Sequence, residues 1–149
     1  MAGIRIAGDA DVDAVRRCVD AAFAPYVDRI GRPPAPMLQD YAALIRTGEV
    51  RVLDGPDGIM GVLVLQRRAD HLFVDTIAVD PAHRGQGFGR ALMNFGEEEA
   101  RRGGLPEIRL YTHERMVENL PFYAALGFVE TDRRVEDGYD RIYFRKRLR

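Results

Sequence analysis

This chain has a single cysteine, a net charge close to zero and no long apolar run. Cys18 is the only cysteine among 149 residues, which excludes an intrachain disulfide and a zinc site made of several thiolates. The formal net charge of −1 creates no bulk field toward nucleic acid or an anionic membrane. No apolar stretch has the length of a signal peptide or of a bilayer-spanning helix. We therefore expect a cytoplasmic protein with no metal, no nucleic-acid partner and no membrane partner.

Basic residues do gather near the end of the chain, at Arg141, Arg145, Lys146, Arg147 and Arg149. A basic cluster can contact nucleic acid. Charged side chains also protect the exposed edge of a β-sheet from pairing with other molecules. We interpret this cluster as part of a solvated edge strand.

The length and the 46% hydrophobic content predict one domain, residues 1–149, with a sizeable core. Apolar spacing and turn residues predict the order strand, two helices, three strands, helix, strand, helix, two strands. The expected strands are 4–6, 49–53, 59–66, 71–79, 107–112, 129–135 and 139–148, and the expected helices are 12–23, 36–45, 88–101 and 119–126. A helix joins strands 71–79 and 107–112, so these two should be parallel. The fold class is therefore α+β, with a mixed, mostly antiparallel seven-stranded sheet and helices on both faces.

The same patterns give three local expectations. The proline-rich residues 25–36 form a loop, and Pro36 begins the second helix with Leu38 on its buried side. Cys18 lies on the apolar stripe of the first helix, as a buried structural thiol does. The third helix directs the three glutamates at 97–99 toward solvent.

A glycine-rich turn, Arg84-Gly85-Gln86-Gly87-Phe88-Gly89, lies between a predicted strand and a predicted helix. The first N–H groups of a helix lack intrahelical partners and the helix dipole is positive there, so such turns bind phosphate. The glycine spacing does not match the dinucleotide fingerprint, and the Gly-Lys-Ser or Gly-Lys-Thr of nucleoside triphosphatases is absent. The alternative interpretation is a turn that only caps the helix.

In this spacing, Arg84, Gly87 and Gly89 resemble the pyrophosphate loop of the GNAT superfamily of N-acetyltransferases. Residues 74–81, which lead into the loop, and residues 119–128 carry the resemblance further. The order of elements also resembles the GNAT fold over nearly the whole chain. The resemblance implies transfer of an acetyl group from acetyl-CoA to a primary amine, without a metal.

In GNAT proteins two parallel strands splay apart, and the pantetheine arm of acetyl-CoA enters the gap. The resemblance places the backbone of Ile77 and Val79 on the pantetheine amides, and the N–H of Ile77 or Ala78 on the thioester oxygen. Asn119 either contacts pantetheine or caps the short helix. The resemblance assigns to acetyl-CoA the residues Ile77, Ala78, Val79, Arg84, Gly85, Gln86, Gly87, Phe88, Gly89, Arg90, Asn119 and Tyr123.

Acetyl transfer to an amine needs a base, because an alkyl amine has a pKa of about 10.4 and only about one molecule in two thousand is neutral at pH 7. Asp75 stands where GNAT proteins often carry an acidic residue and is the first candidate base, with a structural ion pair as its alternative role. His71 is the second candidate, and Glu114 and Glu118 could line the mouth of the acceptor site. Tyr123 matches the tyrosine that the family uses as general acid beside the CoA sulfur, or is a core aromatic residue.

The loop at residues 25–40 is expected to cover the acceptor site, with Tyr26, Arg29, Arg32 and His113 as substrate contacts. Arg29 or Arg32 could hold a carboxylate of an amino-acid-like acceptor. The sequence leaves open which small-molecule or peptide amine is used, and whether the protein forms the homodimer common in the family. Two other interpretations stay open: a catalytically idle acyl-CoA sensor, and an interaction module that binds no CoA.

Overall fold

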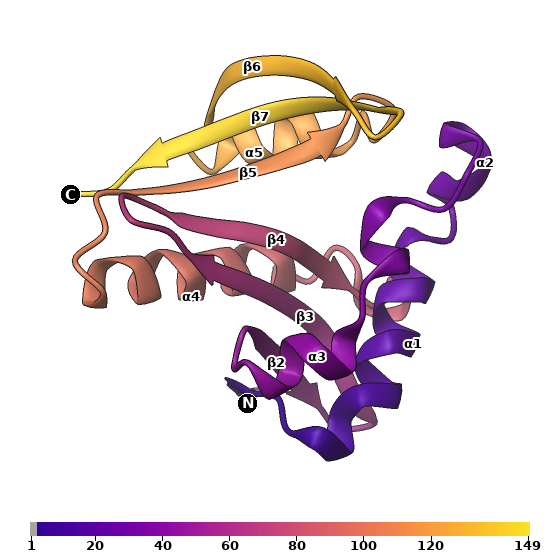
Figure 1. Ribbon diagram of the computed structural model, residues 1–149. Coiled ribbons are helices and arrows are strands. Elements are labelled where there is room, and N and C mark those ends of the chain that lie inside the picture. Colours follow the sequence, from indigo (N-terminus) through magenta and orange to yellow (C-terminus); the bar gives the residue numbers. More distant parts are fainter. Residues whose placement is uncertain (1–2) are drawn as a thin grey trace.

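The computed structural model describes residues 3–149, which form one seven-stranded sheet with helices on both faces (Figure 1). The strand order is β1-β2-β3-β4-β5-β7-β6, and only β4 and β5 are parallel neighbours. The strands are β1 (Ile4–Ile6), β2 (Val50–Gly55), β3 (Gly58–Arg67), β4 (Leu72–Val79), β5 (Glu107–His113), β6 (Val129–Glu136) and β7 (Tyr139–Arg147). The helices are α1 (Val12–Phe23), α2 (Tyr26–Ile30), α3 (Tyr41–Arg46), α4 (Phe88–Arg102) and α5 (Asn119–Ala125), with short 3₁₀ turns η1 (Asp9–Asp11), η2 (Ala35–Leu38) and η3 (Pro81–His83). The expected α+β class and the mixed, mostly antiparallel sheet are confirmed.

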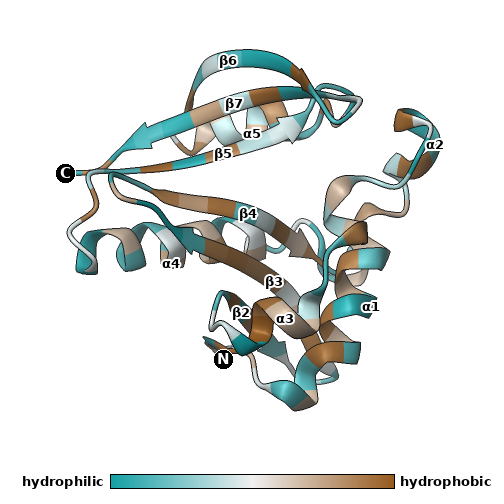
Figure 2. Cartoon of the chain, viewed as in Figure 1, coloured by the Kyte–Doolittle hydropathy of each residue, from teal (hydrophilic) through white to brown (hydrophobic). Residues whose placement is uncertain are grey.

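Two apolar clusters lie on opposite faces of this sheet. Alternate residues of β3 belong to different clusters: Val62 and Val64 pack with α1, whereas Leu63 and Leu65 pack with α4. Figure 2 shows hydrophobic residues along most of β3, which both clusters share. Cys18 belongs to the α1 cluster and is 2% exposed, which confirms the buried thiol.

A β-bulge at Asp75 changes which way the side chains of β4 face. Val64 pairs with Thr76, but the next residue of β3 pairs with Val74, so Asp75 has no partner on β3. Val74 packs in the α4 cluster, and Ile77 packs against the same cluster. Because side chains alternate along a strand, Asp75 and Thr76 must both face away from α4.

The parallel strands β4 and β5 separate after a short paired stretch, as Figure 1 shows. Pairing covers only residues 72–74 of β4 and 108–110 of β5. β4 continues to Val79 and β5 to His113 without pairing to each other. The backbone of β4 beyond Val74 therefore has a strand neighbour on one side only, and a gap opens within the sheet.

The prediction for residues 25–40 is wrong in three details. The segment predicted as a loop contains the helix α2, which ends at Gly31 in the left-handed conformation (φ 88°). The next helix, α3, begins at Tyr41 because the side chain of Asp40 accepts a hydrogen bond from a backbone N–H of its first turn. Pro36 lies instead in the preceding 3₁₀ turn, and Leu38 is exposed.

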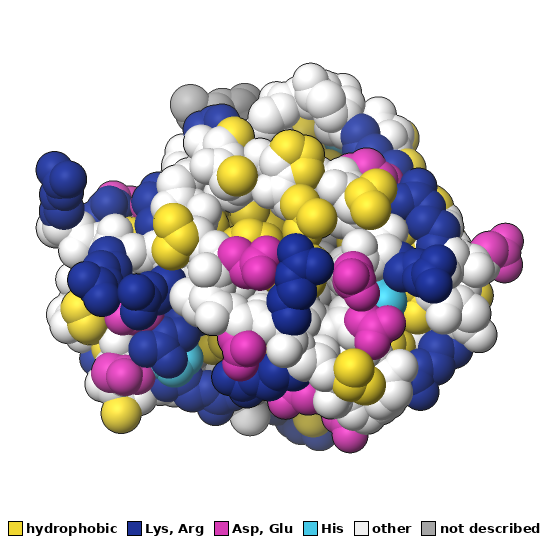
Figure 3. All heavy atoms as spheres, turned by 90° about the horizontal axis from the view of Figure 1, so that it is seen from above, with side chains coloured by type: hydrophobic (Ala, Val, Ile, Leu, Met, Phe, Trp, Pro, Cys, Tyr) yellow, Lys and Arg dark blue, Asp and Glu magenta, His cyan; other side chains and the backbone are white. Residues whose placement is uncertain are grey.

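The prediction of a C-terminal edge strand is also wrong. β7 lies between β5 and β6, so it has a hydrogen-bonded neighbour on each side, and β6 forms the edge. The charges of β6 pair along the strand, Arg133 with Glu130 at 3.0 Å and Arg134 with Asp132 at 2.6 Å. Seen from above, basic and acidic side chains are interspersed over the surface (Figure 3), so no single-sign patch faces this way.

One of the three glutamates predicted to face solvent is buried. Glu97 is 4% exposed, and its Oε1 lies 2.9 Å from Nζ of Lys146 and 3.7 Å from Nη2 of Arg101. Its neighbour Glu98 is exposed and pairs with Arg101 at 2.6 Å. The ion pair from α4 to β7 could not be seen in the sequence because these elements are adjacent only in the fold.

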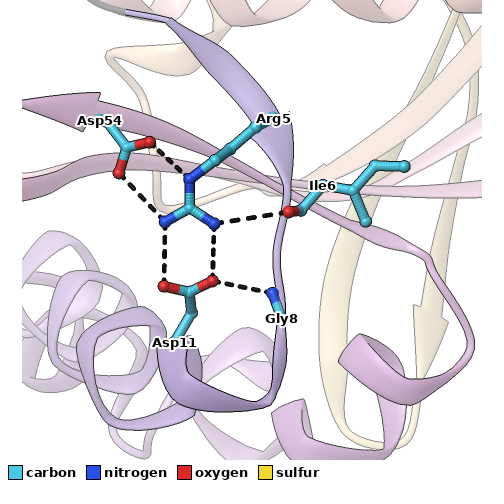
Figure 4. A network of polar contacts seen from close by, with 5 residues as sticks. All are labelled: Arg5, Ile6, Gly8, Asp11 and Asp54. Atoms are coloured by element: carbon cyan, nitrogen blue, oxygen red, sulfur yellow. Dashed lines mark hydrogen bonds and ion pairs between the residues drawn. The ribbon is translucent and has the colours of Figure 1, made fainter.

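Arg5 joins the first strand to two other segments (Figure 4). Its guanidinium donates to both carboxylate oxygens of Asp11, at 2.8 and 3.0 Å, and of Asp54, at 2.6 and 3.2 Å. Asp11 also accepts a hydrogen bond from the N–H of Gly8 at 2.8 Å. The bonds from Arg5 and Gly8 lower the pKa of Asp11 from 3.8 to about 2.

Candidate active site

The glycine loop between η3 and α4 presents a row of unpaired backbone donors. Gly85 and Gly87 have φ angles of 75° and 82°, which side chains with a Cβ rarely adopt. A Cβ built on either glycine would meet no atom within 4 Å, so the space beside them is open. Among residues 3–149, none of the N–H groups of residues 85–90 donates a hydrogen bond. Free donors at a helix N-terminus suit a phosphate group.

A groove that we call the loop cleft runs from this loop to the gap between β4 and β5. Every residue that the resemblance assigned to acetyl-CoA lines the cleft, except Gln86. The side chain of Arg84 reaches across to α1, where its Nη2 donates to the carbonyl of Ala22 at 3.2 Å. This bond ties the glycine loop to the opposite wall of the cleft.

The backbone of β4 faces the loop cleft through alternate residues. The N–H of Asp80 donates to the carbonyl of Met60 at 2.8 Å, so this residue directs its polar groups toward β3. Hydrogen-bonded pairs alternate along antiparallel strands, so the N–H of Ala78 also points to β3, and those of Ile77 and Val79 point into the gap. Ile77 is therefore better placed than Ala78 to donate to a ligand there.

A second pocket, which we call the inner cavity, lies between the diverging strands. β4 contributes residues 74–77, β5 residues 110–113, and the segment before α3 residues 34–36. Phe23, Ile77, Asn119 and Tyr123 line both the inner cavity and the loop cleft. The two pockets thus meet at one shared wall, where groups bound in each can come into contact.

Asp75 lines the inner cavity from the bulge of β4. Its Oδ2 accepts hydrogen bonds from Nε2 of Gln39 and from Oγ1 of Thr76, the latter at 3.2 Å. Within residues 3–149 it forms no ion pair, so the alternative role considered for it has no support, and its Oδ1 accepts no hydrogen bond. Burial raises the pKa of Asp75, because the charged form is poorly solvated, and a carboxylate with a raised pKa is a stronger base.

Tyr123 stands at the shared wall, 4% exposed and surrounded by aromatic rings. Its ring centroid lies 5.4 Å from that of Phe122, 5.9 Å from Phe128 and 5.7 Å from Phe144. Its hydroxyl has no hydrogen-bond partner in the part of the chain that the structure describes. Burial raises the pKa of Tyr123, so the phenol stays protonated and is a hydrogen-bond donor.

Comparison with known proteins decides the family. The model of the acetyltransferase (GNAT) family matches residues 16–128 of the 149. The chain belongs to the GNAT family of acetyltransferases. This match spans β4, the glycine loop and α5, which are the GNAT segments that build the loop cleft.

Solved structures show the same fold. The PaiA N-acetyltransferase of Thermoplasma acidophilum, in complex with coenzyme A, matches with a TM-score of 0.80 over 99% of both chains, at 16% identity. The ribosomal-protein-S18-alanine N-acetyltransferase of Escherichia coli matches with a TM-score of 0.79 over 99% of this chain and 94% of its own, at 24% identity. Nourseothricin acetyltransferase is 29% identical over 66% of this chain and 64% of its own, with a TM-score of 0.62.

Asn119 joins α5 to β5 within this GNAT fold. It is the first residue of α5, and no side-chain hydrogen bond caps that helix, so the capping role is not what the structure shows. Its Nδ2 donates instead to Oγ1 of Thr112 at 3.0 Å. Thr112 also lines the inner cavity, and nothing in the sequence singled it out.

Tyr26 and Arg29 lie at the loop cleft and its rim, outside the inner cavity. Tyr26 lines the cleft, and its hydroxyl donates to Glu118 Oε2 at 3.3 Å. Arg29 forms an exposed ion pair with the other oxygen of the same carboxylate at 2.5 Å. Both residues are therefore already paired with Glu118, which lines the loop cleft and not the cavity.

Arg32 does not line the inner cavity, but it contacts Tyr139, which does. Its guanidinium donates to the carbonyl of Asp137 and lies 3.5 Å from the ring centroid of Tyr139. The hydroxyl of Tyr139 in turn donates to the carbonyl of Pro33 at 2.6 Å. We call this set of contacts, which joins residues 32–33 to the turn between β6 and β7, the clasp.

Of the predicted acceptor contacts, only His113 lines the inner cavity. Its Nδ1 accepts a hydrogen bond from the N–H of Arg115 at 3.0 Å, and burial lowers its pKa. The neutral ring then carries its proton on Nε2, which makes His113 a donor and not a base. His71, the second candidate base, lies at the far end of β4 and bonds to Asp70 at 2.7 Å, and Glu114 lies on the outer surface.

The sequence did not point to Tyr139 and Arg141 of β7, which line the cavity, or to Gln39, which bonds Asp75 without lining it. The period-two alternation of strand 139–148 shows that Tyr139 and Arg141 share a face. It does not show that β7 pairs beside β5, which brings that face to the cavity.

Within residues 3–149, no group of three or more His, Cys, Asp and Glu side chains is arranged to hold a metal ion. No helix in this range is long and apolar enough to cross a membrane.

Proposed function

We propose that this chain transfers the acetyl group of acetyl-CoA to a primary amine of a small acceptor, by direct attack while both are bound. The observation that carries the proposal is the wall shared by the loop cleft and the inner cavity, at Phe23, Ile77, Asn119 and Tyr123. A donor in the cleft and an amine in the cavity can meet there, so no acetylated enzyme is required.

The residues of the loop cleft fit acetyl-CoA. The free N–H groups of residues 85–90 suit its pyrophosphate, and the free backbone of Ile77 and Val79 suits the amides of its pantetheine arm. Acetyl-CoA supplies an acyl group on a thioester, whose thiolate is a good leaving group.

Three groups of the chain assist the transfer. Asp75 accepts the proton that the acceptor ammonium group must lose before its nitrogen can attack the acyl carbon, and the nitrogen loses its second proton to solvent as the amide forms. The N–H of Ile77 donates to the carbonyl oxygen, which becomes negative as the bond forms. The hydroxyl of Tyr123 donates a hydrogen bond to the sulfur as the carbon–sulfur bond breaks, and the thiolate then takes its proton from solvent.

The clasp supports a small acceptor over a long peptide. Its contacts from Arg32 to Asp137 and from Tyr139 to Pro33 join the segment that ends in the cavity-lining residues 34–36 to the start of β7, where Tyr139 also lines the cavity. A long peptide that passed between these two segments would have to break these bonds, whereas a small amine need not.

Thermal unfolding with and without acetyl-CoA is the first test, with desulfo-CoA and adenosine diphosphate as controls. A ligand at one hundred times its Kd stabilises the fold by about 2.7 kcal/mol, a shift of several degrees for a domain of this size. Thiol release from acetyl-CoA with a panel of amines is the second test. No shift at millimolar acetyl-CoA would refute the proposal, and a shift without turnover of any amine would favour the acyl-CoA sensor.

A further inference from the structure

Two side chains of opposite charge line the inner cavity without pairing to each other. Asp75 enters from β4 and Arg141 from β7. Within residues 3–149, no ion pair joins them, although ion pairs are common elsewhere in this chain. The side chain of Arg141 is only 12% exposed. Asp75 has no ion-pair partner and Arg141 has only the long contact to Glu136, so a ligand that brings closer partners of opposite charge would stabilise both groups.

Arg141 has few partners of its own. Its guanidinium lies 4.3 Å from the ring centroid of Tyr111 and 5.6 Å from that of Tyr139. In the described part of the chain its one polar contact is with Oε1 of Glu136, at a long 3.5 Å, and that oxygen also accepts a hydrogen bond from Tyr143. A guanidinium has five N–H donors in a planar fork that matches a carboxylate. Most of those donors are therefore available to a ligand in the cavity.

Arg134 provides the contrast within the same sheet. Its guanidinium also lies over a tyrosine ring, 4.4 Å from the centroid of Tyr143. It is half-exposed and pairs with Asp132 at 2.6 Å, and it does not line the inner cavity. Stacking on tyrosine is thus compatible with a satisfied surface arginine, and Arg141 differs in lining the cavity with only a long 3.5 Å contact to its carboxylate partner.

The rest of the cavity complements these charges. His113, the residue that pairs with Arg141 across β5 and β7, offers a donating Nε2 beside it. Ile30, Pro34, Val74 and Met116 contribute apolar walls. The cavity therefore combines one carboxylate, one guanidinium with a neighbouring donor, and apolar surface.

We propose that the acceptor is a single amino acid, or a similar amino carboxylate, with an apolar side chain, and that Arg141 binds its carboxylate while its amine faces Asp75. This rests on the proposed acetyl transfer and adds its substrate class. Arg29 and Arg32, to which the sequence analysis gave the carboxylate, are engaged with Glu118 and Asp137 instead. Arg141 is then a specificity-determining residue and takes no part in proton transfer.

Matched acceptors test the proposal through thiol release from acetyl-CoA. The pairs are leucine with isoamylamine, methionine with 3-(methylthio)propylamine, and phenylalanine with phenethylamine. Each pair differs in the carboxylate alone. We expect kcat/KM to be about 10- to 100-fold higher for at least one amino acid than for its amine, the range of a hydrogen bond to a charged group. Equal or greater activity on all three amines would overturn the proposal.

Arg141→Met keeps an apolar stem against the tyrosine rings and removes the donors. We expect it to raise KM for the preferred amino acid about 10- to 100-fold and to change kcat/KM for the matching amine less than threefold. Arg134→Met, the matched control, should change neither. An equal loss on both acceptors in Arg141→Met would show a structural role and overturn the proposal.

The outcomes distinguish a wrong substrate class from a failure of the proposed acetyl transfer. If acetyl-CoA stabilises the fold and only amines without a carboxylate are acetylated, the substrate class is wrong and the acetyl transfer stands. If acetyl-CoA gives neither a thermal shift nor thiol release, both fail. If Arg141→Met does not fold, Arg141→Lys keeps the charge but not the fork, and should lose part of the preference for the amino acid over its amine.

Discussion

Replacing Gly87 by alanine should separate backbone strain from ligand binding, because the chain contains a matched glycine elsewhere. Gly87 has φ 82° and Gly48 has φ 78°, and a Cβ on either would meet no atom within 4 Å. An alanine in this left-handed conformation costs about 1–2 kcal/mol. Gly87 lines the loop cleft, whereas Gly48 follows α3 and does not.

The two variants should therefore lose the same stability and differ in their response to acetyl-CoA. For a domain of this size, about 1 kcal/mol corresponds to about 2–4 °C, so each melting temperature should fall by about 2–8 °C. In Gly87→Ala the added methyl would also occupy open space beside the free N–H groups, where we expect it to crowd a bound phosphate. Losing one hydrogen bond to a charged group costs about 1.5–3 kcal/mol, which raises Kd about 10- to 150-fold.

Thermal unfolding measures both effects at one acetyl-CoA concentration, one hundred times the wild-type Kd. The wild type and Gly48→Ala should gain about 2.7 kcal/mol, and Gly87→Ala should gain about 0.4 kcal/mol if its Kd rises 100-fold. An equal ligand shift in both variants would refute the assignment of the loop as a phosphate cradle. A smaller loss of stability in one glycine variant than in the other, without ligand, would instead contradict the strain argument.

Three further predictions concern single side chains. Asp75→Asn keeps the shape and the bond from Gln39 but cannot take a proton. We expect kcat to fall about 10²- to 10⁴-fold, with an unchanged or higher melting temperature. A loss of kcat below threefold would remove Asp75 as the base. Tyr123→Phe should lower kcat about 10- to 100-fold at saturating acetyl-CoA, and an unchanged kcat would leave the tyrosine with a packing role only. The pKa of Asp11 is lower in the folded chain, so its ion pair stabilises the fold above about pH 4 and is lost as pH falls toward 2. Arg5→Gln should thus lower the free energy of unfolding by about 1 kcal/mol at pH 7, after allowing for screening at a half-exposed arginine. This difference in stability from wild type should shrink between pH 4 and 2. A constant difference would contradict the ion pair with Asp11 as its cause.

Periodicity and turn chemistry were enough to predict most elements, because they depend on residues close in sequence. The α1 stripe, the glycine loop before α4 and Gly127 after α5, with φ 94°, are local signals of this kind. Local signals failed where two of them competed. The prolines of residues 25–36 led to the prediction of a loop where α2 forms. Pro36 led to a predicted helix start five residues before Tyr41, where α3 begins after its cap at Asp40.

The donor side of the site was predictable for the same reason. The glycine loop and the β4 segment before it are contiguous in sequence, so a family motif covers them almost completely. The resemblance already placed the backbone of Ile77 and Val79 on pantetheine, but it left the donor to the thioester oxygen open between Ile77 and Ala78. The bulge at Asp75 decides that Ile77 and Val79, and not Ala78, face the gap, and a bulge depends on the register with β3.

The acceptor side was decided by tertiary structure. Asp75 and Arg141 are 66 positions apart in the sequence, and they share a cavity only because β7 inserts between β5 and β6. The same insertion turned an expected edge strand into an inner one and buried Glu97 against Lys146. Residue patterns specify elements and short motifs because their causes are local. Strand order and register bring distant side chains together, and for this protein they determine which charges an acceptor meets.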